Sequence, residues 1–346
     1  MNANGQNPNG STEPSRAPHA AFSYGCAGSG IIIGDAWHSL QLFPDRTFRC
    51  CVTSPPYWGL RDYGIPNQIG AEKGLDEYIA NLTEIFQQVK RVLRDDGTLW
   101  LNIGDSYTSG NRTWRDADKK NPARGMGYRP PTPDGLKPKD LIGVPWRIAF
   151  ALQADGWYLR SDIVWYKPNC QPESVKDRPT RAHEYLFLFS KSQDYFYDRE
   201  AMLESATSKT GARNRRTVWS INTEPFADAH FATFPASLVE PPILAGTQPN
   251  DMVLDPFFGS GTVGEVCLKL KRRFVGIELK PDYAEISAKR LHWQETSNGN
   301  RPDGLSSSEA KRANRLPRTP PGGQRTIPFG GVEEDQLMIR PLISRL

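Results

Sequence analysis

The sequence has few cysteines and no long apolar run. Its five cysteines among 346 residues are odd in number and form no Cys-x-x-Cys pair. This pattern argues against a disulfide framework or a zinc site, and it fits a reducing, cytoplasmic environment. No apolar stretch reaches the length of about 18 residues that a membrane-spanning helix requires. The first residues also lack the basic start and apolar stretch of a secretory signal. We therefore expect a cytoplasmic protein with neither a membrane partner nor a bound metal.

A strong excess of one charge is also missing. The formal net charge of +4 permits a polyanionic partner without requiring one. Residues 1–22 are rich in Asn, Pro, Ser and Gly, and residues 296–346 carry mostly Pro, Gly, Ser and Arg without periodicity. Such segments cannot bury enough apolar surface to fold, so we expect both ends to be mostly disordered. The folded domain is predicted at 23–295.

Apolar periodicity within this domain alternates between strand and helix. Buried strands are predicted at "GIIIGD", "FRCCVT" and "TLWLNIGD". The apolar spacing over residues 75–94 predicts an amphipathic helix between the last two. A strand–helix–strand succession implies parallel pairing, so an α/β fold is expected. The long polar stretch 106–138 has no period, and loops of that length in compact domains are usually functional or disordered.

A glycine-rich motif lies late in the chain. Residues 252–279, "MVLDPFFGSGTVGEVCLKLKRRFVGIEL", predict a strand, a tight turn, a short helix and a second strand. Gly259, Gly261 and Gly264 match G-x-G-x-x-G, and Glu278 follows about twenty residues after the first glycine. In this context the pattern favours a nucleoside ligand over a plain βαβ crossover. Little sheet can follow the motif, so the order of elements is that of a circularly rearranged nucleoside-binding fold.

A second motif, "TSPPYW" at residues 53–58, ends the strand "FRCCVT". Proline has no N–H to donate, so Pro-Pro stops the ladder. The motif is either a stiff turn with an aromatic plug or a binding ledge at the carboxyl end of a strand, where open α/β sheets bind their ligands. Together with "DPFFGSGT" it resembles the DNA amino-methyltransferases in which the catalytic motif precedes the cofactor motif. The resemblance covers roughly residues 30–290 and implies a mostly parallel seven-stranded sheet with helices on both faces. It also implies S-adenosylmethionine as cofactor and double-stranded DNA as substrate.

The resemblance assigns residues to the cofactor and to the reaction. The cofactor would be bound by Asp35, Thr233, Pro235, Asp255, Phe257, Gly259, Gly261, Thr262 and Glu278. Asp35 has an alternative role as the N-cap of the helix that follows it. The catalytic ledge would comprise Ser54, Pro55, Pro56 and Tyr57. There the Ser54 hydroxyl and the Pro55 carbonyl would accept hydrogens of an exocyclic amine, and Tyr57 would stack on a base flipped out of the duplex.

The target amine and the DNA contacts are less tightly defined. Serine at position 54, where adenine-specific members usually carry Asp, favours the N4 amine of cytosine over the N6 amine of adenine. The stretch 165–191 also resembles the N4-cytosine branch, and recognition segments are expected at about 106–138 and 167–225. Phosphate or base contacts are expected from Lys167, Lys176, Arg178, Arg181, Arg213, Arg215 and Arg216. Of the aromatic pair Trp165–Tyr166, one member should face the core, because alternate strand residues point to opposite sides.

Three alternatives stay open at this point. The first is adenine N6 methylation on the same fold. The second is a nicotinamide-dependent oxidoreductase, which rests only on G-x-G-x-x-G, and the third is an inactive DNA-binding module. A cognate restriction endonuclease is a possible partner, and the chain is expected to act as a monomer or a homodimer.

Overall fold

The computed structural model describes residues 24–26, 28–66, 68–108, 130–205, 211–224 and 234–293. The expected disorder of residues 1–22 and 296–346, and the site residue Thr233, therefore lie outside the described residues. So does most of the predicted recognition segment at 106–138. No helix among the described residues is long and apolar enough to cross a membrane.

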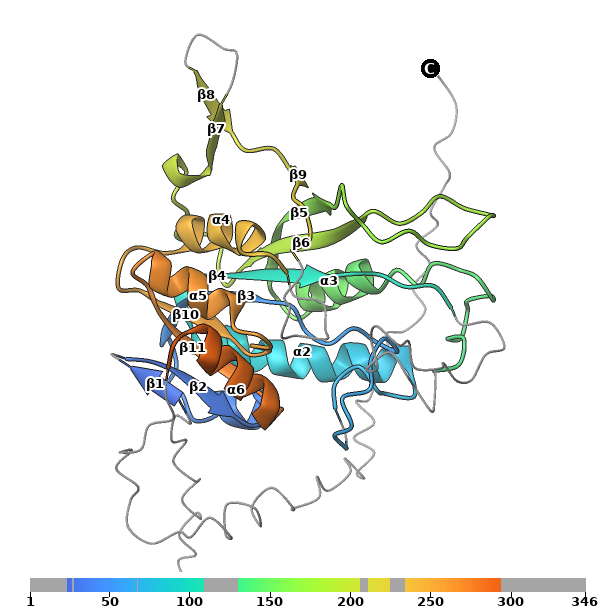
Figure 1. The fold of residues 1–346 in the computed structure, drawn as a ribbon, viewed down its shortest axis with the longest axis horizontal. Coiled ribbons are helices and arrows are strands. Elements are labelled where there is room, and N and C mark those ends of the chain that lie inside the picture. Colours follow the sequence, from blue (N-terminus) through green and yellow to red (C-terminus); the bar gives the residue numbers. More distant parts are fainter. Residues whose placement is uncertain are drawn as a thin grey trace, which may run out of the picture. The chain divides into compact units, whose positions relative to one another are not determined.

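The described chain forms an α/β fold around one large sheet (Figure 1). The sheet strands are β1 (Tyr24–Cys26), β2 (Ser29–Ile33), β3 (Phe48–Thr53), β4 (Leu93–Ile103), β5 (Tyr158–Tyr166), β6 (His183–Ser190), β9 (Val218–Ser220), β10 (Met252–Asp255) and β11 (Arg273–Glu278). The helices are α1 (Ala36–Leu40), α2 (Leu75–Val92), α3 (Val144–Ala154), α4 (Ala236–Gly246), α5 (Thr262–Lys269) and α6 (Pro281–Arg290). A separate hairpin joins β7 (Leu203–Ser205) to β8 (Ala212–Asn214), just after a 3-10 turn at Glu200–Met202.

The strand order is β1-β2-β11-β10-β3-β4-β6-β5-β9. Strands β2, β11, β10, β3 and β4 run parallel, whereas β6 is antiparallel to both β4 and β5. The expected mostly parallel sheet is confirmed. Two three-residue edge strands, β1 and β9, extend the expected seven strands to nine. Strand β6 lies inside the range 167–225, so a strand of the main sheet interrupts this predicted recognition segment.

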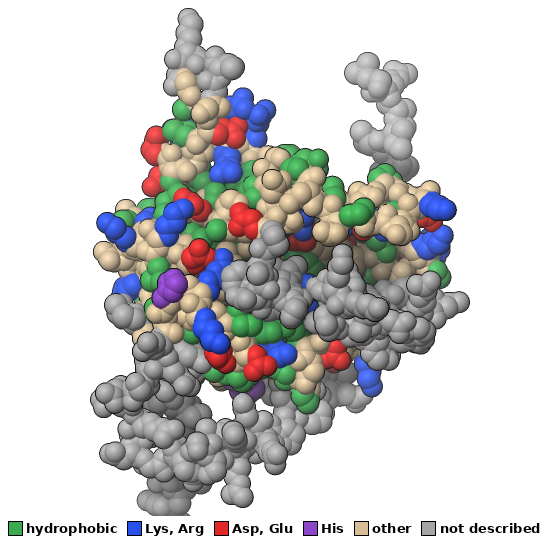
Figure 2. Space-filling view, viewed as in Figure 1, with side chains coloured by type: hydrophobic (Ala, Val, Ile, Leu, Met, Phe, Trp, Pro, Cys, Tyr) green, Lys and Arg blue, Asp and Glu red, His purple; other side chains and the backbone are tan. Residues whose placement is uncertain are grey.

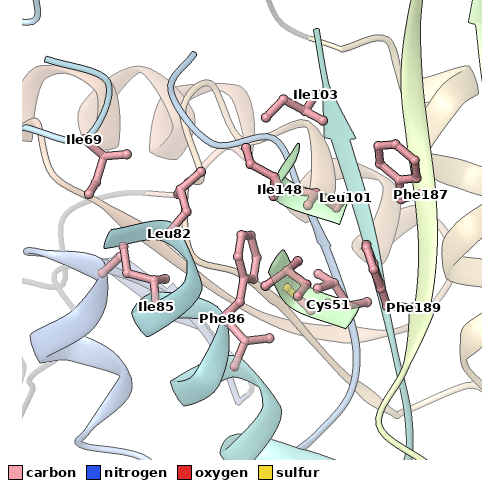
Figure 3. Packing of buried hydrophobic residues seen from close by; sticks show 14 of the residues in the cluster. Cys51, Ile69, Leu82, Ile85, Phe86, Leu101, Ile103, Ile148, Phe187 and Phe189 are labelled. Carbon is pink, nitrogen blue, oxygen red and sulfur yellow. The ribbon is translucent and has the colours of Figure 1, made fainter. Parts of the chain in front are cut away.

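The two faces of the sheet carry separate apolar layers. Side chains of β3 alternate between them: Cys51 packs in the layer covered by α1, α2 and α3, whereas Cys50 and Val52 belong to the layer under α4, α5 and α6. Figure 3 shows the first layer, where Leu82 and Phe86 of α2 point toward the sheet. The predicted amphipathic helix is confirmed, and it ends at Val92 because the chain enters β4 at the next residue.

The carboxyl ends of the five parallel strands therefore meet at one edge of the sheet. The loops that leave β2, β3, β4, β10 and β11 begin there. In open α/β sheets this edge is where ligands bind.

Candidate active site

A cavity of about 1220 Å³ opens at this edge. It is lined by residues that directly follow all five parallel strands: Gly34 after β2, Ser54 after β3, Gly104 after β4, Pro256 after β10 and Leu279 after β11. Pockets for single drug-sized ligands usually measure about 300–1,000 Å³. The cavity is thus large enough for a nucleoside-type ligand and a second group beside it.

Glu278 and the glycine-rich turn form one end of the cavity. The carboxylate of Glu278 accepts the backbone N–H of Gly259 at Oε2 and that of Lys280 at Oε1, both at 2.8 Å. Burial raises the pKa of Glu278, and these backbone donors oppose the shift. Each carboxylate oxygen can accept more than one hydrogen bond. Glu278 can therefore also accept donors from a ligand, as the hydroxyls of a ribose would be. Phe257 and Thr262 line the cavity as well.

Gly261 marks the entry into α5. Its φ of +82° is in the left-handed region, and an added Cβ would lie 2.9 Å from the Cβ of Ser287. Only glycine fits this position without strain. The turn can therefore hold its backbone close to a ligand, although Gly261 itself does not line the cavity.

Asp255 lies beneath the turn. It is 1% exposed, and its Oδ1 accepts the hydroxyl of Thr53 at 2.6 Å and the N–H of Phe257 at 3.0 Å. Burial raises the pKa of Asp255 to about 7. The carboxyl group ties the end of β10 to the neighbouring strand β3, which carries the ledge, and it is not among the residues that line the cavity.

The remaining predicted cofactor residues differ in position. Asp35 lines the cavity and is also the N-cap of α1, since its Oδ1 accepts the N–H of His38 at 3.1 Å. Both alternatives for this residue are therefore compatible with its position. Pro235 is buried at the start of α4, and its neighbour Phe234 lines the cavity instead.

The predicted ledge lines the cavity with all four of its residues, Ser54, Pro55, Pro56 and Tyr57. The carbonyl of Pro56 accepts the hydroxyl of Tyr78 at 2.8 Å, and Trp58 is buried, with its Nε1 donating to the Glu72 carbonyl at 3.1 Å. These two bonds anchor the ledge to Tyr78 of α2 and to the backbone of Glu72.

Tyr57 is held by groups that sequence reasoning did not identify. Its hydroxyl donates to Glu184 Oε2 at 2.7 Å, and Asn102 Oδ1 lies 3.3 Å away. Lys167 forms an ion pair with the other carboxylate oxygen of Glu184 and lies 4.2 Å from the centre of the Trp165 ring. Burial is the main cause of a pKa for Tyr57 well above its ordinary value. Glu184 is the second residue of β6, in the stretch 165–191 whose resemblance was noted, but no residue type or spacing singled it out.

The predicted DNA-binding residues fall into two groups. Lys167, Arg178 and Arg181 line the cavity, and Lys176 is exposed on the same loop between β5 and β6. Arg178 lies over the Tyr107 ring at 3.7 Å and pairs with Glu173. Three of these four cations therefore line the same cavity as the ledge.

Arg213, Arg215 and Arg216 form the second group, at the β7–β8 hairpin. Arg213 and Arg216 pair with Glu204, and Arg215 lies over the Trp219 ring at 4.3 Å. None of the three lines the cavity. In Figure 1 the hairpin projects upward beyond α4, whereas the arrow of β4 points to the right. Figure 2 shows basic side chains both on this hairpin and at the edge that carries the β5–β6 loop.

The aromatic pair behaves as strand geometry requires. Trp165 is 2% exposed and donates its Nε1 to the Ile221 carbonyl, while Tyr166 on the opposite side is 43% exposed. Trp165 is nevertheless among the residues that line the cavity.

The chain shares its fold with solved DNA methyltransferases. The solved PvuII DNA methyltransferase, which is cytosine-N4-specific, has a TM-score of 0.59 at 21% identity, covering 85% of this chain and 93% of that protein. A putative DNA modification methylase from Thermus thermophilus, in complex with S-adenosyl-L-methionine, has a TM-score of 0.52 at 24% identity, covering 75% and 92%.

The family follows from the sequence comparisons. The DNA methylase family of N6/N4 methyltransferases matches residues 48–289. The Type II methyltransferase M.Cfr9I of Citrobacter freundii is 63% identical over 270 residues, which cover 78% of this chain and 90% of that protein. M.SmaI of Serratia marcescens is 62% identical over 262 residues, which cover 75% and 90%. The chain belongs to the DNA methylase family, and the expected cofactor S-adenosylmethionine is confirmed as the methyl donor of that family. These findings favour the methylase over the oxidoreductase alternative.

Proposed function

We propose that this chain is a site-specific DNA methyltransferase that transfers a methyl group to the N4 amine of cytosine in a flipped-out base. The observation that carries the proposal is that one cavity is lined both by the ledge Ser54–Tyr57 and by the glycine-rich turn with Glu278. A methyl donor at the turn and a base on the ledge would then meet in one cavity. Holding two reactants in contact is itself a large part of catalysis.

The turn has the chemistry to hold S-adenosylmethionine. Glu278 would accept the ribose hydroxyls, Asp35 would accept the adenine amine, and Phe257 and Thr262 would contact the rest of the molecule. Gly261 gives the turn the left-handed backbone it needs. When bound, the cofactor supplies an electrophilic methyl group on a sulfonium centre.

The ledge has the chemistry to prepare an exocyclic amine. The lone pair of such an amine is delocalised into the ring, so it attacks poorly. The Ser54 hydroxyl and the Pro55 carbonyl would accept its hydrogens and draw the nitrogen toward a pyramidal, nucleophilic geometry. Tyr57 would stack on the base, and Pro56 stiffens the ledge.

Arg181 lines the cavity that contains the ledge, and its guanidinium is 3.7 Å from Asp105. An arginine here would donate to the ring nitrogen next to the exocyclic amine, which is N3 in cytosine and N1 in adenine. The preference for cytosine therefore rests on Ser54.

The duplex would be bound by the cations around the cavity, with Lys167, Lys176, Arg178 and Arg181 contacting the strand that carries the flipped base. Contacts from Arg213, Arg215 and Arg216 would have to reach a different part of the duplex. The Type II relatives support a role in a restriction–modification system, with a cognate endonuclease as a possible partner of a monomeric or dimeric enzyme.

The test is nucleoside mass spectrometry of unmethylated duplex DNA after incubation with the protein and S-adenosylmethionine. The substrates should include the sites of M.Cfr9I and M.SmaI. We expect N4-methylcytosine. N6-methyladenine would keep the reaction but refute the role of Ser54 in choosing the base, and no product on any of these DNAs would oppose the proposal. Ser54→Ala should lose transfer while calorimetry still detects cofactor binding; full activity would remove Ser54 from the mechanism.

A further inference from the structure

Methyl transfer to an amine leaves the nitrogen with one proton too many. This follows from the proposed function, in which neutral acceptors, the Ser54 hydroxyl and the Pro55 carbonyl, face the amine. Neither is a base that can keep the proton. A nearby carboxylate can take it, directly or through hydroxyl groups.

Glu184 is connected to the ledge in the required way. The Tyr57 hydroxyl donates to Glu184 Oε2 at 2.7 Å, and Ser54, three residues before Tyr57, lines the same cavity. The ammonium group of Lys167 pairs with Oε1, which leaves Oε2 to the phenol. The side chains of Lys167 and Glu184 are 16% and 18% exposed, so solvent has little access to the pair.

Gly104 keeps the phenol and the carboxylate together. A Cβ at this position would lie 2.7 Å from Tyr57 Cε2 and 3.2 Å from Glu184 Cδ. Because Gly104 has no side chain, the Tyr57 ring and the Glu184 carboxylate can both lie against its backbone, directly after β4. Asn102 Oδ1, 3.3 Å from the phenol, limits rotation of the hydroxyl.

The other carboxylates on this side of the cavity are already engaged. Asp105 accepts backbone N–H groups of Ser106, Gly143 and Val144 and faces Arg181. Glu173 pairs with Arg178. Neither has a described hydrogen bond to Ser54 or Tyr57.

We propose that Glu184 is the terminal acceptor of the proton released by the target amine, reached through the Ser54 hydroxyl and the Tyr57 phenol. As the nitrogen lone pair forms the N–CH₃ bond, the C–S bond breaks and its electron pair stays on sulfur. One N–H proton passes to Ser54 Oγ, the Ser54 proton passes to the Tyr57 oxygen, and the Tyr57 proton passes to Glu184 Oε2. Both hydroxyls end protonated as they began, and Glu184 ends neutral.

The local charges are compatible with this direction of transfer. Burial raises the pKa of Tyr57 well above its ordinary value, so the phenol is protonated at neutral pH and has a proton to pass on. The titratable groups that face Glu184 are Tyr57, Lys167 and His183, and burial lowers the pKa of His183. At neutral pH His183 is therefore uncharged, and Lys167 supplies the positive charge beside Glu184.

Glu184→Gln separates a relay from simple positioning. The amide can still accept the phenol's hydrogen bond, so a residue that only orients Tyr57 would tolerate the change. A relay would not, because an amide does not take up the proton. General-base groups typically contribute about 100-fold or more, so we expect single-turnover methyl transfer to fall about 100-fold in both Glu184→Gln and Glu184→Ala. The KM for S-adenosylmethionine should change little.

Tyr57→Phe keeps the ring but removes the hydroxyl between Ser54 and Glu184. Its rate of methyl transfer should also fall about 100-fold. Glu84→Gln, the same chemical change at an exposed residue of α2 that does not line the cavity, is the matched control and should retain the wild-type rate. A Glu184→Gln enzyme with the wild-type rate overturns the relay. Product analysis of the wild-type enzyme keeps this outcome distinct from a failure of the proposed N4 methylation, and calorimetric cofactor binding verifies that each variant folds.

Discussion

Gly104→Ala tests whether the placement of Tyr57 controls catalysis. The added methyl group would lie 2.7 Å from Tyr57 Cε2, whereas ordinary van der Waals contacts begin at 3.4 Å. The ring or the strand must therefore move by about 0.7 Å. The backbone does not oppose the change, because Gly104 is not among the glycines with positive φ.

A shift of this size has a known order of effect. Misplacing a reacting group by about 1 Å can reduce the rate about 100-fold. We expect Gly104→Ala to lower kcat by about 10- to 100-fold, which corresponds to about 1.4–2.7 kcal/mol of activation free energy. The cofactor end of the cavity is formed by other strands, so the affinity for S-adenosylmethionine should stay within about twofold of wild type.

The assay is single-turnover transfer of a radiolabelled methyl group to duplex DNA, with cofactor affinity measured by calorimetry. Gly74→Ala is the control, because φ at Gly74 is −118° and an added Cβ there meets nothing within 4 Å. If Gly104→Ala transfers methyl groups as fast as Gly74→Ala, then the position of the Tyr57 ring does not limit the reaction.

Three further predictions concern the turn and the DNA surface. Burial raises the pKa of Asp255 to about 7 from an ordinary value of 3.8, so the folded state holds this proton more tightly than the unfolded state. Protonated Asp255 therefore stabilises the folded state near pH 4, and this stabilisation is lost as the pH rises through 7. Between these pH values the free energy of unfolding of the wild type, measured in urea, should fall by at most about 4 kcal/mol relative to that of Asp255→Asn. Gly261→Val, strained at φ +82°, should abolish cofactor binding in calorimetry while the circular dichroism spectrum stays folded; unchanged affinity would exclude the turn as the cofactor site. Arg178→Glu should weaken duplex binding at least tenfold and reduce its salt dependence, and Arg213→Glu should weaken it less in the same filter-binding assay; the reverse order would move the duplex to the hairpin.

The sequence predicted the elements whose signal is local. Apolar spacing located α2 to within two residues, and the prolines and glycines located the ledge and the turn, because these residues restrict the backbone wherever they occur. Both motifs directly follow parallel strands, so the rule that open α/β sheets bind ligands at the carboxyl ends of their strands predicted that they lie at one edge.

Contacts between distant residues were not predictable in this way. Glu184 is 127 positions from Tyr57, and nothing in its own neighbourhood indicates that it will accept the phenol. The position of the hairpin arginines could not be predicted either. A basic run indicates a charged surface, but the place of that surface depends on the pairing of β7 with β8 and of β9 with β5. Asp255 could be assigned to the turn from the sequence. The burial of its side chain beneath the turn could not, because it involves a hydrogen bond to Thr53 of the neighbouring strand.

The order of strands has a consequence for synthesis of the chain. Strands β10 and β11 are made last, yet they lie in the middle of the sheet, between β2 and β3. While the ribosome is still translating residues 252–278, β2 and β3 each have an unpaired inner edge, and the layer formed by α4, α5 and α6 is incomplete. Unpaired strand edges readily join other chains, and nonlocal pairing of this kind folds slowly. The nascent enzyme is therefore most exposed to aggregation shortly before it is complete, and a message that ends before residue 252 should yield insoluble protein rather than a smaller folded domain.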